Sequence, residues 1–354
     1  MFAAESELQS RASLVANVGT ALIRDGLVFA PYDIHKEQTP HGKFESILAA
    51  IPDCYHLDFS SSLIDFGKVK ALHVLGGFSQ GMGDAIMGVG LLQYIKAHFG
   101  CRIRLFLACT MPTFVYEIYS LAAQERILDS VELLPAQTDR IAADGATVVD
   151  LTDLFGHRFR EGAVVDMYAS ALGLDAAKIP LEYKRPTWLR GLKVAPVDQP
   201  YSLIISDSKE SFKSVPDSVV AQAVRTINQR HSLPVYGFSS RIADTAFLNV
   251  SSVSTSARDF IQIIANATYV YTVDTAAMHI AAGLGVPTTA FVATDFWSSW
   301  CHYYLKEPAF QIAHVAGGTD AEWEAAVARI AAYPIHSATG SEDVCAVLPH
   351  GDGR

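Results

Sequence analysis

Two series of alternating strand and helix patterns constrain the fold of this chain more than any other feature. The first series starts with the apolar run at residues 71–75 and continues with a helical pattern at about 84–99 and a strand pattern at 102–108. The second series starts at Tyr201 and includes a strand pattern at 269–273. Strands that alternate with helices of this length predict parallel sheets covered by helices.

A proline-rich segment separates the two series. Residues 185–200 lack apolar periodicity and are the predicted linker. A chain of 354 residues is also longer than one typical core supports. We therefore predict an α/β protein with two Rossmann-like, doubly wound parallel-sheet domains, at residues 71–190 and 200–335, which face a central cleft. Residues 1–70 are predicted to form a mainly helical extension, and residues 336–354 a loose tail.

The composition excludes several classes of protein. Hydrophobic residues make up 50% of the chain and charged residues 18%, which favours large buried cores over disorder. A net charge of −10 argues against a nucleic-acid surface and against docking on anionic lipid. The cysteines lack a CxxC spacing, which favours a reducing cytoplasmic location. The apolar segment 261–293 divides into strand, helix and strand, so we predict no transmembrane segment.

The helix that begins after residues 269–273 is the strongest candidate site. Asp274 and Thr275 follow the strand directly, and a run of small residues comes next. A helix start of this kind presents backbone N–H groups and a positive dipole end, which favour an anion such as a diphosphate. The alternative is that Asp274 and Thr275 are only helix caps and that His279 is a core histidine.

Glycines precede the first predicted helix of the amino-terminal series. Gly81, Met82 and Gly83 lead into Asp84, while Ile86 stands where a dinucleotide-binding fingerprint needs its third glycine. NAD binding is therefore disfavoured. Asp84 is either a helix cap or a carboxylate that works as a general base.

Residues 255–289 resemble glycosyltransferase family 9, the ADP-heptose heptosyltransferases. The family pattern is Asp-Ser/Thr-Gly-x-Met-His-Leu-Ala-Ala-Ala-Leu-Gly-x-Pro-Thr, and this chain matches it at Asp274, Thr275, Met278, His279, Ala281, Ala282, Leu284, Gly285, Pro287 and Thr288. It departs at Ala276, where the family usually has glycine. The Gly81–Asp84 loop and the Lys213-Ser-Val-Pro element also resemble family motifs, although Val215 replaces an aromatic residue.

The resemblance implies a GT-B-like fold and an inverting, metal-independent transfer of a sugar, heptose by family, from a nucleotide-diphosphate donor to a hydroxyl. It implies that Asp84 is the general base and that Lys213 neutralises the leaving diphosphate. The acceptor loop would be Gly81, Met82 and Gly83. The implied donor-binding residues are Ser206, Asp274, Thr275, Ala276, Ala277, Met278 and His279.

The implied partners are a nucleotide sugar and an acceptor that is a glycan, a lipopolysaccharide core or a protein. We expect no cofactor, and a homo-oligomer is compatible with the sequence. Two other functions stay open: a nucleotide-sugar epimerase or hydrolase on the same scaffold, and a noncatalytic nucleotide-sugar-binding protein. Turnover of a nucleotide sugar without acceptor would identify the first. Donor binding without any transfer would identify the second.

Overall fold

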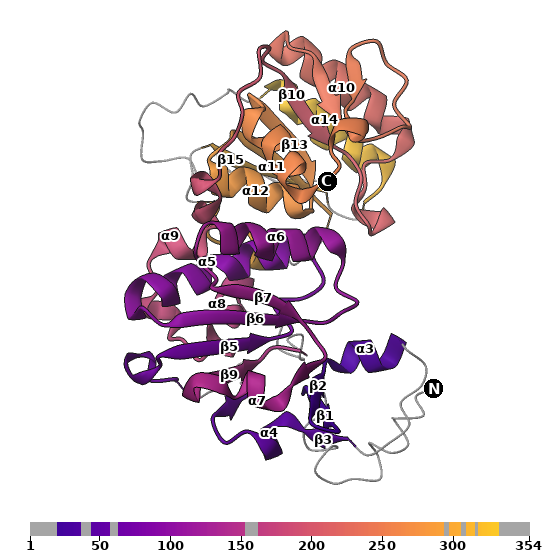
Figure 1. The fold of residues 1–354 in the computed structure, drawn as a ribbon. Coiled ribbons are helices and arrows are strands. Elements are labelled where there is room, and N and C mark those ends of the chain that lie inside the picture. Colours follow the sequence, from indigo (N-terminus) through magenta and orange to yellow (C-terminus); the bar gives the residue numbers. More distant parts are fainter. Residues whose placement is uncertain are drawn as a thin grey trace, which may run out of the picture. The chain divides into compact units, whose positions relative to one another are not determined.

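The computed structural model describes residues 20–36, 44–56, 63–152, 162–293, 297–305, 309–315 and 318–332. The chain divides into two compact units, Met1–Lys184 and Arg185–Arg354 (Figure 1). Each unit contains a parallel sheet packed with helices, which confirms the predicted α/β class. The predicted tail at residues 336–354 lies outside the described residues.

Unit 1 is built on a five-stranded parallel sheet with the order β4-β9-β5-β6-β7. The strands are β4 (Cys54–Tyr55), β5 (Ala71–Leu75), β6 (Arg102–Leu107), β7 (Ser130–Leu133) and β9 (Thr147–Asp150). The helices are α5 (Met82–Phe99), α6 (Thr113–Gln124), α7 (Thr138–Ile141), α8 (Val164–Ala171) and α9 (Leu181–Lys184), with short 3-10 turns η1 (Phe66–Lys68), η2 (Ala143–Gly145) and η3 (Ala176–Lys178). Helix α5 packs against α6, α8 and α9.

A second, antiparallel sheet of unit 1 comes mostly from the amino-terminal extension. Its order is β3-β1-β2-β8, with β1 (Leu22–Arg24), β2 (Leu27–Phe29), β3 (Glu45–Ser46) and β8 (Ala136–Gln137). Two short helices, α3 (Pro31–Lys36) and α4 (Ile47–Ala50), accompany these strands. Side chains of the extension share one core cluster with residues of β5, β6 and β9. The extension therefore packs against the parallel sheet of unit 1.

Two buried carboxylates join the extension to the parallel sheet. Asp33 of α3 accepts hydrogen bonds from the backbone N–H groups of Cys109 and Thr110, at 2.9 and 3.1 Å. Asp150, at the end of β9, accepts the Ala21 N–H at 2.6 Å. Burial raises the pKa of Asp150. These bonds make the extension a structural part of unit 1.

The extension was predicted to be mainly helical, and its described part contains these strands as well as helices α3 and α4. Asp25 and Gly26 both have positive φ, at 53° and 75°, and form the tight turn between β1 and β2. An Asp-Gly pair between short apolar runs is typical of a hairpin turn. That local pattern decides the structure at residues 22–29. Residues 5–19, where the predicted helix begins, lie outside the described residues.

Unit 2 is built on a six-stranded parallel sheet with the order β12-β11-β10-β13-β14-β15. The strands are β10 (Ser202–Ile205), β11 (Val235–Gly237), β12 (Phe247–Asn249), β13 (Tyr269–Val273), β14 (Thr288–Val292) and β15 (Phe310–His314). The helices are α10 (Asp217–His231), α11 (Ala257–Asn266), α12 (Ala276–Leu284), α13 (Trp297–Cys301) and α14 (Asp320–Ala332), with η4 (Thr187–Gly191), η5 (Ser211–Lys213) and η6 (Ser251–Val253).

Two separate core clusters lie against the sheet of unit 2. One joins α10 and α14 to the sheet around Trp323, and the other joins α12 to it around Met278 and Tyr304. In chain order, the strands are arranged third, second, first, fourth, fifth and sixth, which is the Rossmann order. The sequence patterns located β10, β11, β13 and β14 but missed the strands β12 and β15.

The boundary between the two units lies earlier than predicted. The sequence placed the end of the first domain at residue 190 and a linker at 185–200, but unit 2 already begins at Arg185. Element η4 packs on α12, where Arg190 Nε donates a hydrogen bond to the Gly283 carbonyl at 2.8 Å. A side chain at residue 283 would meet Pro186, with a backbone contact at 2.5 Å. The start of the predicted linker is therefore packed structure. None of the described helices has the length and apolarity that crossing a membrane requires.

Candidate functional site

The first candidate site lies where the strand order of unit 1 changes direction. After β5 the chain builds β6 and β7 on one side, whereas β9 pairs with β5 on the other side. The loops that follow β5 and β9 therefore leave two neighbouring strands at the carboxyl end of the sheet. Such a switch point is where open α/β sheets bind ligands.

Glycines allow the loop after β5 to pack closely at this point. Gly76 has a φ of 87°, and a Cβ there would lie 2.7 Å from the Cα of Thr152, in the loop that follows β9. Gly77 has a φ of 71°, and its Cβ would lie 2.8 Å from the Tyr119 hydroxyl. That hydroxyl accepts the Phe78 N–H at 2.9 Å. These contacts fix the loop and leave no room for a side chain at either glycine.

Asp84 lies in the first turn of α5, directly after this loop. Its Oδ1 accepts a hydrogen bond from the Tyr168 hydroxyl at 2.6 Å, and its side chain is half-buried. The N-cap position belongs to Gly81, where a Cβ would collide with Asp84 Oδ2. Gly81, Met82 and Gly83 are all half-buried beside it. Asp84 is therefore not the N-cap residue of the helix.

Two tyrosines of unit 1 were missed by sequence reasoning. Tyr168 comes from α8 and packs on Phe78, with ring centroids 5.3 Å apart, while Tyr119 comes from α6. Neither belongs to a sequence motif. Each contacts the loop after β5 from a distant part of the chain, which sequence patterns do not reveal. A side chain at Gly88 would collide with the Phe78 ring, which explains a glycine inside a long helix.

The second candidate site lies at the switch point of unit 2. Strands β10 and β13 are neighbours at the centre of the sheet, and the chain moves outward from them in opposite directions. Lys213 lies in the loop after β10, and Asp274 follows β13. The Lys213 ammonium and the Asp274 Oδ2 are 2.8 Å apart, with side-chain exposures of 21% and 8%. Two residues that are distant in sequence thus form an ion pair at this point.

Helix α12 begins next to this ion pair. Thr275 is its N-cap and accepts the Ala277 N–H at 3.3 Å, while the Thr275 carbonyl accepts the Met278 N–H at 3.1 Å. The Ala276 N–H has no acceptor among the residues that the structure describes. The helix end therefore presents a backbone donor beside the Lys213–Asp274 pair, an arrangement that suits an anion.

Three of the predicted donor-binding residues have side chains that are buried in the core. Ala277 and Met278 are fully buried, and His279 is 3% exposed. His279 Nδ1 lies 2.7 Å from the Tyr304 hydroxyl. Burial lowers the pKa of His279 to about 4, so its ring is neutral at pH 7. Residues 277–283 of α12 are all buried, so these side chains hold the helix in place.

Ser206 also has a supporting position. It is 3% exposed, and its carbonyl accepts the Val215 N–H at 2.8 Å. Its hydroxyl lies 3.4 Å from Asp207 Oδ2. Ser206 thus fixes the two ends of the loop that carries Lys213. Among the residues given coordinates with enough certainty to describe, no group of three or more His, Cys, Asp or Glu side chains is placed to hold a metal.

No protein-family model and no curated protein matches the sequence. Solved structures do match. E. coli heptosyltransferase WaaC with ADP is 13% identical, with a TM-score of 0.47 over 73% of this chain and 96% of that chain. The iron-containing dodecameric glycosyltransferase TibC from enterotoxigenic E. coli H10407 is 12% identical, with a TM-score of 0.46 over 68% of this chain and 61% of that chain.

A third solved structure is a glycosyl transferase of family 9 from Veillonella parvula DSM 2008. It is 13% identical, with a TM-score of 0.44 over 74% of this chain and 88% of that chain. The structures to which this chain is similar thus include a member of glycosyltransferase family 9, the family that its sequence resembles.

Proposed function

We propose that this protein is an inverting glycosyltransferase that takes its sugar from a nucleotide-diphosphate donor. The observation that carries the proposal is the Lys213–Asp274 ion pair at the start of α12, at the switch point of unit 2. The same residues belong to the motifs that resemble glycosyltransferase family 9. Geometry and motif therefore favour the same ligand, a diphosphate.

Lys213 is the proposed diphosphate contact. An ammonium group has three N–H donors, and Asp274 accepts one of them at 2.8 Å. Asp274 would thus orient the ammonium, while the other donors meet phosphate oxygens together with the Ala276 N–H. Negative charge grows on the diphosphate as its bond to the sugar breaks. A fixed cation and a helix start next to it would stabilise that charge.

Asp84 is the proposed general base. In an inverting transfer the acceptor oxygen bonds to the anomeric carbon, the bond from that carbon to the diphosphate oxygen breaks, and a carboxylate takes the hydroxyl proton. Asp84 lies at the switch point of unit 1, and Tyr168 donates to one of its oxygens. That hydrogen bond would hold the carboxylate in one orientation. No metal is required by this scheme, since Lys213 and the helix start supply the positive charge.

The substrate assignment comes from the sequence resemblance. ADP-heptose is the proposed donor because the matched motif is that of the ADP-heptose heptosyltransferases. The proposed acceptor is a hydroxyl of a glycan, a lipopolysaccharide core or a protein.

A thermal-shift screen of nucleotide sugars tests the proposal first. A donor at about one hundred times its dissociation constant should stabilise the unit that binds it by about 2.7 kcal/mol. For a unit of this size that corresponds to roughly 5–10 °C. Lys213→Ala should reduce the shift and Asp84→Asn should not. The absence of any shift with ADP-sugars and other nucleotide sugars would contradict the proposal.

A further inference from the structure

The loop that carries Lys213 is closed by several short contacts. It runs from Ser206, after β10, to Asp217, the first residue of α10. Inside it, the Ser208 N–H donates to the Ser214 hydroxyl at 2.9 Å, and the Lys213 N–H donates to the Glu210 carbonyl at 2.9 Å. The loop thus has a defined shape, with Lys213 near its carboxyl end.

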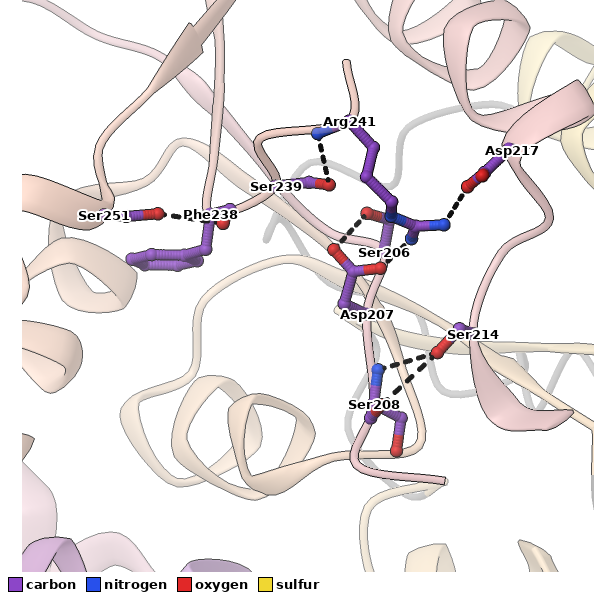
Figure 2. A network of polar contacts seen from close by, with 9 residues as sticks. All are labelled: Ser206, Asp207, Ser208, Ser214, Asp217, Phe238, Ser239, Arg241 and Ser251. Carbon is purple, nitrogen blue, oxygen red and sulfur yellow. Dashed lines mark hydrogen bonds and ion pairs between the residues drawn. The ribbon is translucent and has the colours of Figure 1, made fainter. Parts of the chain in front are cut away.

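Arg241, which belongs to a different loop, contacts both ends of this loop. Its guanidinium forms ion pairs with Asp207, at the beginning of the loop, and with Asp217, at its end (Figure 2). Two different nitrogens take part: Nη2 pairs with Asp207 and Nη1 with Asp217. A planar guanidinium can hold two carboxylates in a fixed relation, which a lysine ammonium does less well.

The backbone of Arg241 is itself held in place. Arg241 lies in the loop after β11, and its N–H donates to the Ser239 hydroxyl at 3.3 Å. Ser239 is 4% exposed. In the same segment, Ser251 donates to the Phe238 carbonyl at 2.8 Å, as Figure 2 shows. The guanidinium therefore projects from an anchored loop onto the Lys213 loop.

The position of these ion pairs matters more than their contribution to stability. The side chains of Arg241, Asp207 and Asp217 are 37%, 43% and 72% exposed, and ion pairs with this exposure stabilise a fold only slightly. Yet both pairs end on the one loop that presents Lys213. Restricting that loop before a ligand arrives reduces the ordering that binding must bring about.

We propose that Arg241 is a positioning residue that closes the loop 207–217 and so places Lys213 for a diphosphate. This inference rests on the proposed function, because it assigns Lys213 to the diphosphate. It differs from a direct role, in which Arg241 leaves its two carboxylates and contacts the phosphates itself. The two roles predict different couplings between Arg241 and Lys213.

A double-mutant cycle on ADP binding separates these roles. The dissociation constant of ADP is measured by calorimetry for the wild type, Arg241→Ala, Lys213→Ala and the double variant. Arg241→Ala should weaken binding about threefold to tenfold, because two partly exposed ion pairs are lost. In the Lys213→Ala background the same change should alter binding less than about twofold. Equal losses in both backgrounds would mean direct contact and would overturn the proposal.

Amide hydrogen exchange gives a reading that needs no ligand. Exchange at residues 208–214 should accelerate in Arg241→Ala, and Arg241→Lys should lie between it and the wild type. Arg225→Ala is the matched control, since Arg225 is also exposed and pairs with Asp244 at 3.2 Å, not with the loop. Unchanged exchange in Arg241→Ala would overturn the inference. Accelerated exchange in a protein that binds no ADP would support loop closure while contradicting the proposed function.

Discussion

Removing the positive charge of Lys213 provides the sharpest test of the ion pair at the start of α12. In Lys213→Met, the carboxylate of Asp274, whose side chain is only 8% exposed, loses its cation. Breaking a buried ion pair on one side costs roughly 3–5 kcal/mol. Because Lys213 is 21% exposed and water can reach the site, we expect a smaller loss in the free energy of unfolding of unit 2, about 2–3 kcal/mol.

The assay follows from the distribution of tryptophan. All four tryptophans, Trp188, Trp297, Trp300 and Trp323, lie in unit 2, so their fluorescence during urea unfolding reports on that unit. Adding Asp274→Asn to Lys213→Met removes the unpaired charge and should recover stability to within about 1 kcal/mol of the wild type. Lys209→Met, at an exposed position of the same loop, is the control. A loss no larger than that of the control, or no recovery in the double variant, would refute the reasoning.

Four further changes test the two sites and their support. Asp84→Asn should lower sugar transfer by about 10²–10⁴-fold with unchanged donor affinity, measured by product formation and calorimetry. Tyr168→Phe removes the 2.6 Å bond to Asp84 and should lower kcat about tenfold, again without a change in donor affinity. The pKa of His279 falls from 6.5 to about 4 on folding. Unit 2 should therefore lose up to about 3 kcal/mol of stability as the pH falls from 6.5 to 4. Urea unfolding at both pH values should show a smaller loss in His279→Gln. Gly88→Ala places a methyl group against the Phe78 ring and should destabilise unit 1 by about 1–3 kcal/mol, measured by proteolysis of the native protein.

Each of these expectations has an outcome that contradicts it. Transfer that survives in Asp84→Asn would remove the general base from the proposal. An equal fall of donor affinity and kcat in Tyr168→Phe would indicate a general structural defect. The sign of the pH effect follows from protonation of the unfolded chain. Between pH 6.5 and 4, His279 is protonated in the unfolded chain and neutral in the folded one, so lowering the pH favours unfolding. A parallel pH profile for His279→Gln would assign the loss to other groups.

The sequence predicted the elements whose patterns are long or sharply bounded. The helix at residues 217–231 follows a proline and has a regular apolar face, and the strand at residues 269–273 was located to the residue. Strand β12 has three residues, too few for a periodic pattern. Strand β15 was missed although its five residues equal the length of β13. In the extension, the Asp25-Gly26 turn was the informative feature, and the apparent helical periodicity upstream obscured it.

The candidate sites were predictable only where chemistry is local in sequence. The Asp274-Thr275 helix start was identified because strand, cap and helix are consecutive. The partnership of Tyr168 with Asp84 and that of Arg241 with the Lys213 loop were not, because each depends on elements that the fold brings together. His279 matched a motif, but its 3% exposure shows that a motif position can serve packing.

The antiparallel sheet at the beginning of the chain limits how this protein can be divided or recombined. A chain shortened to begin at residue 71 would lose β4 and expose the backbone edge of β9, which is an aggregation hazard. It would also leave Asp150 without its bond from Ala21, and the Cys109 and Thr110 amides without Asp33. Replacement of unit 1 by another α/β domain should therefore succeed only when the extension is replaced together with the parallel sheet.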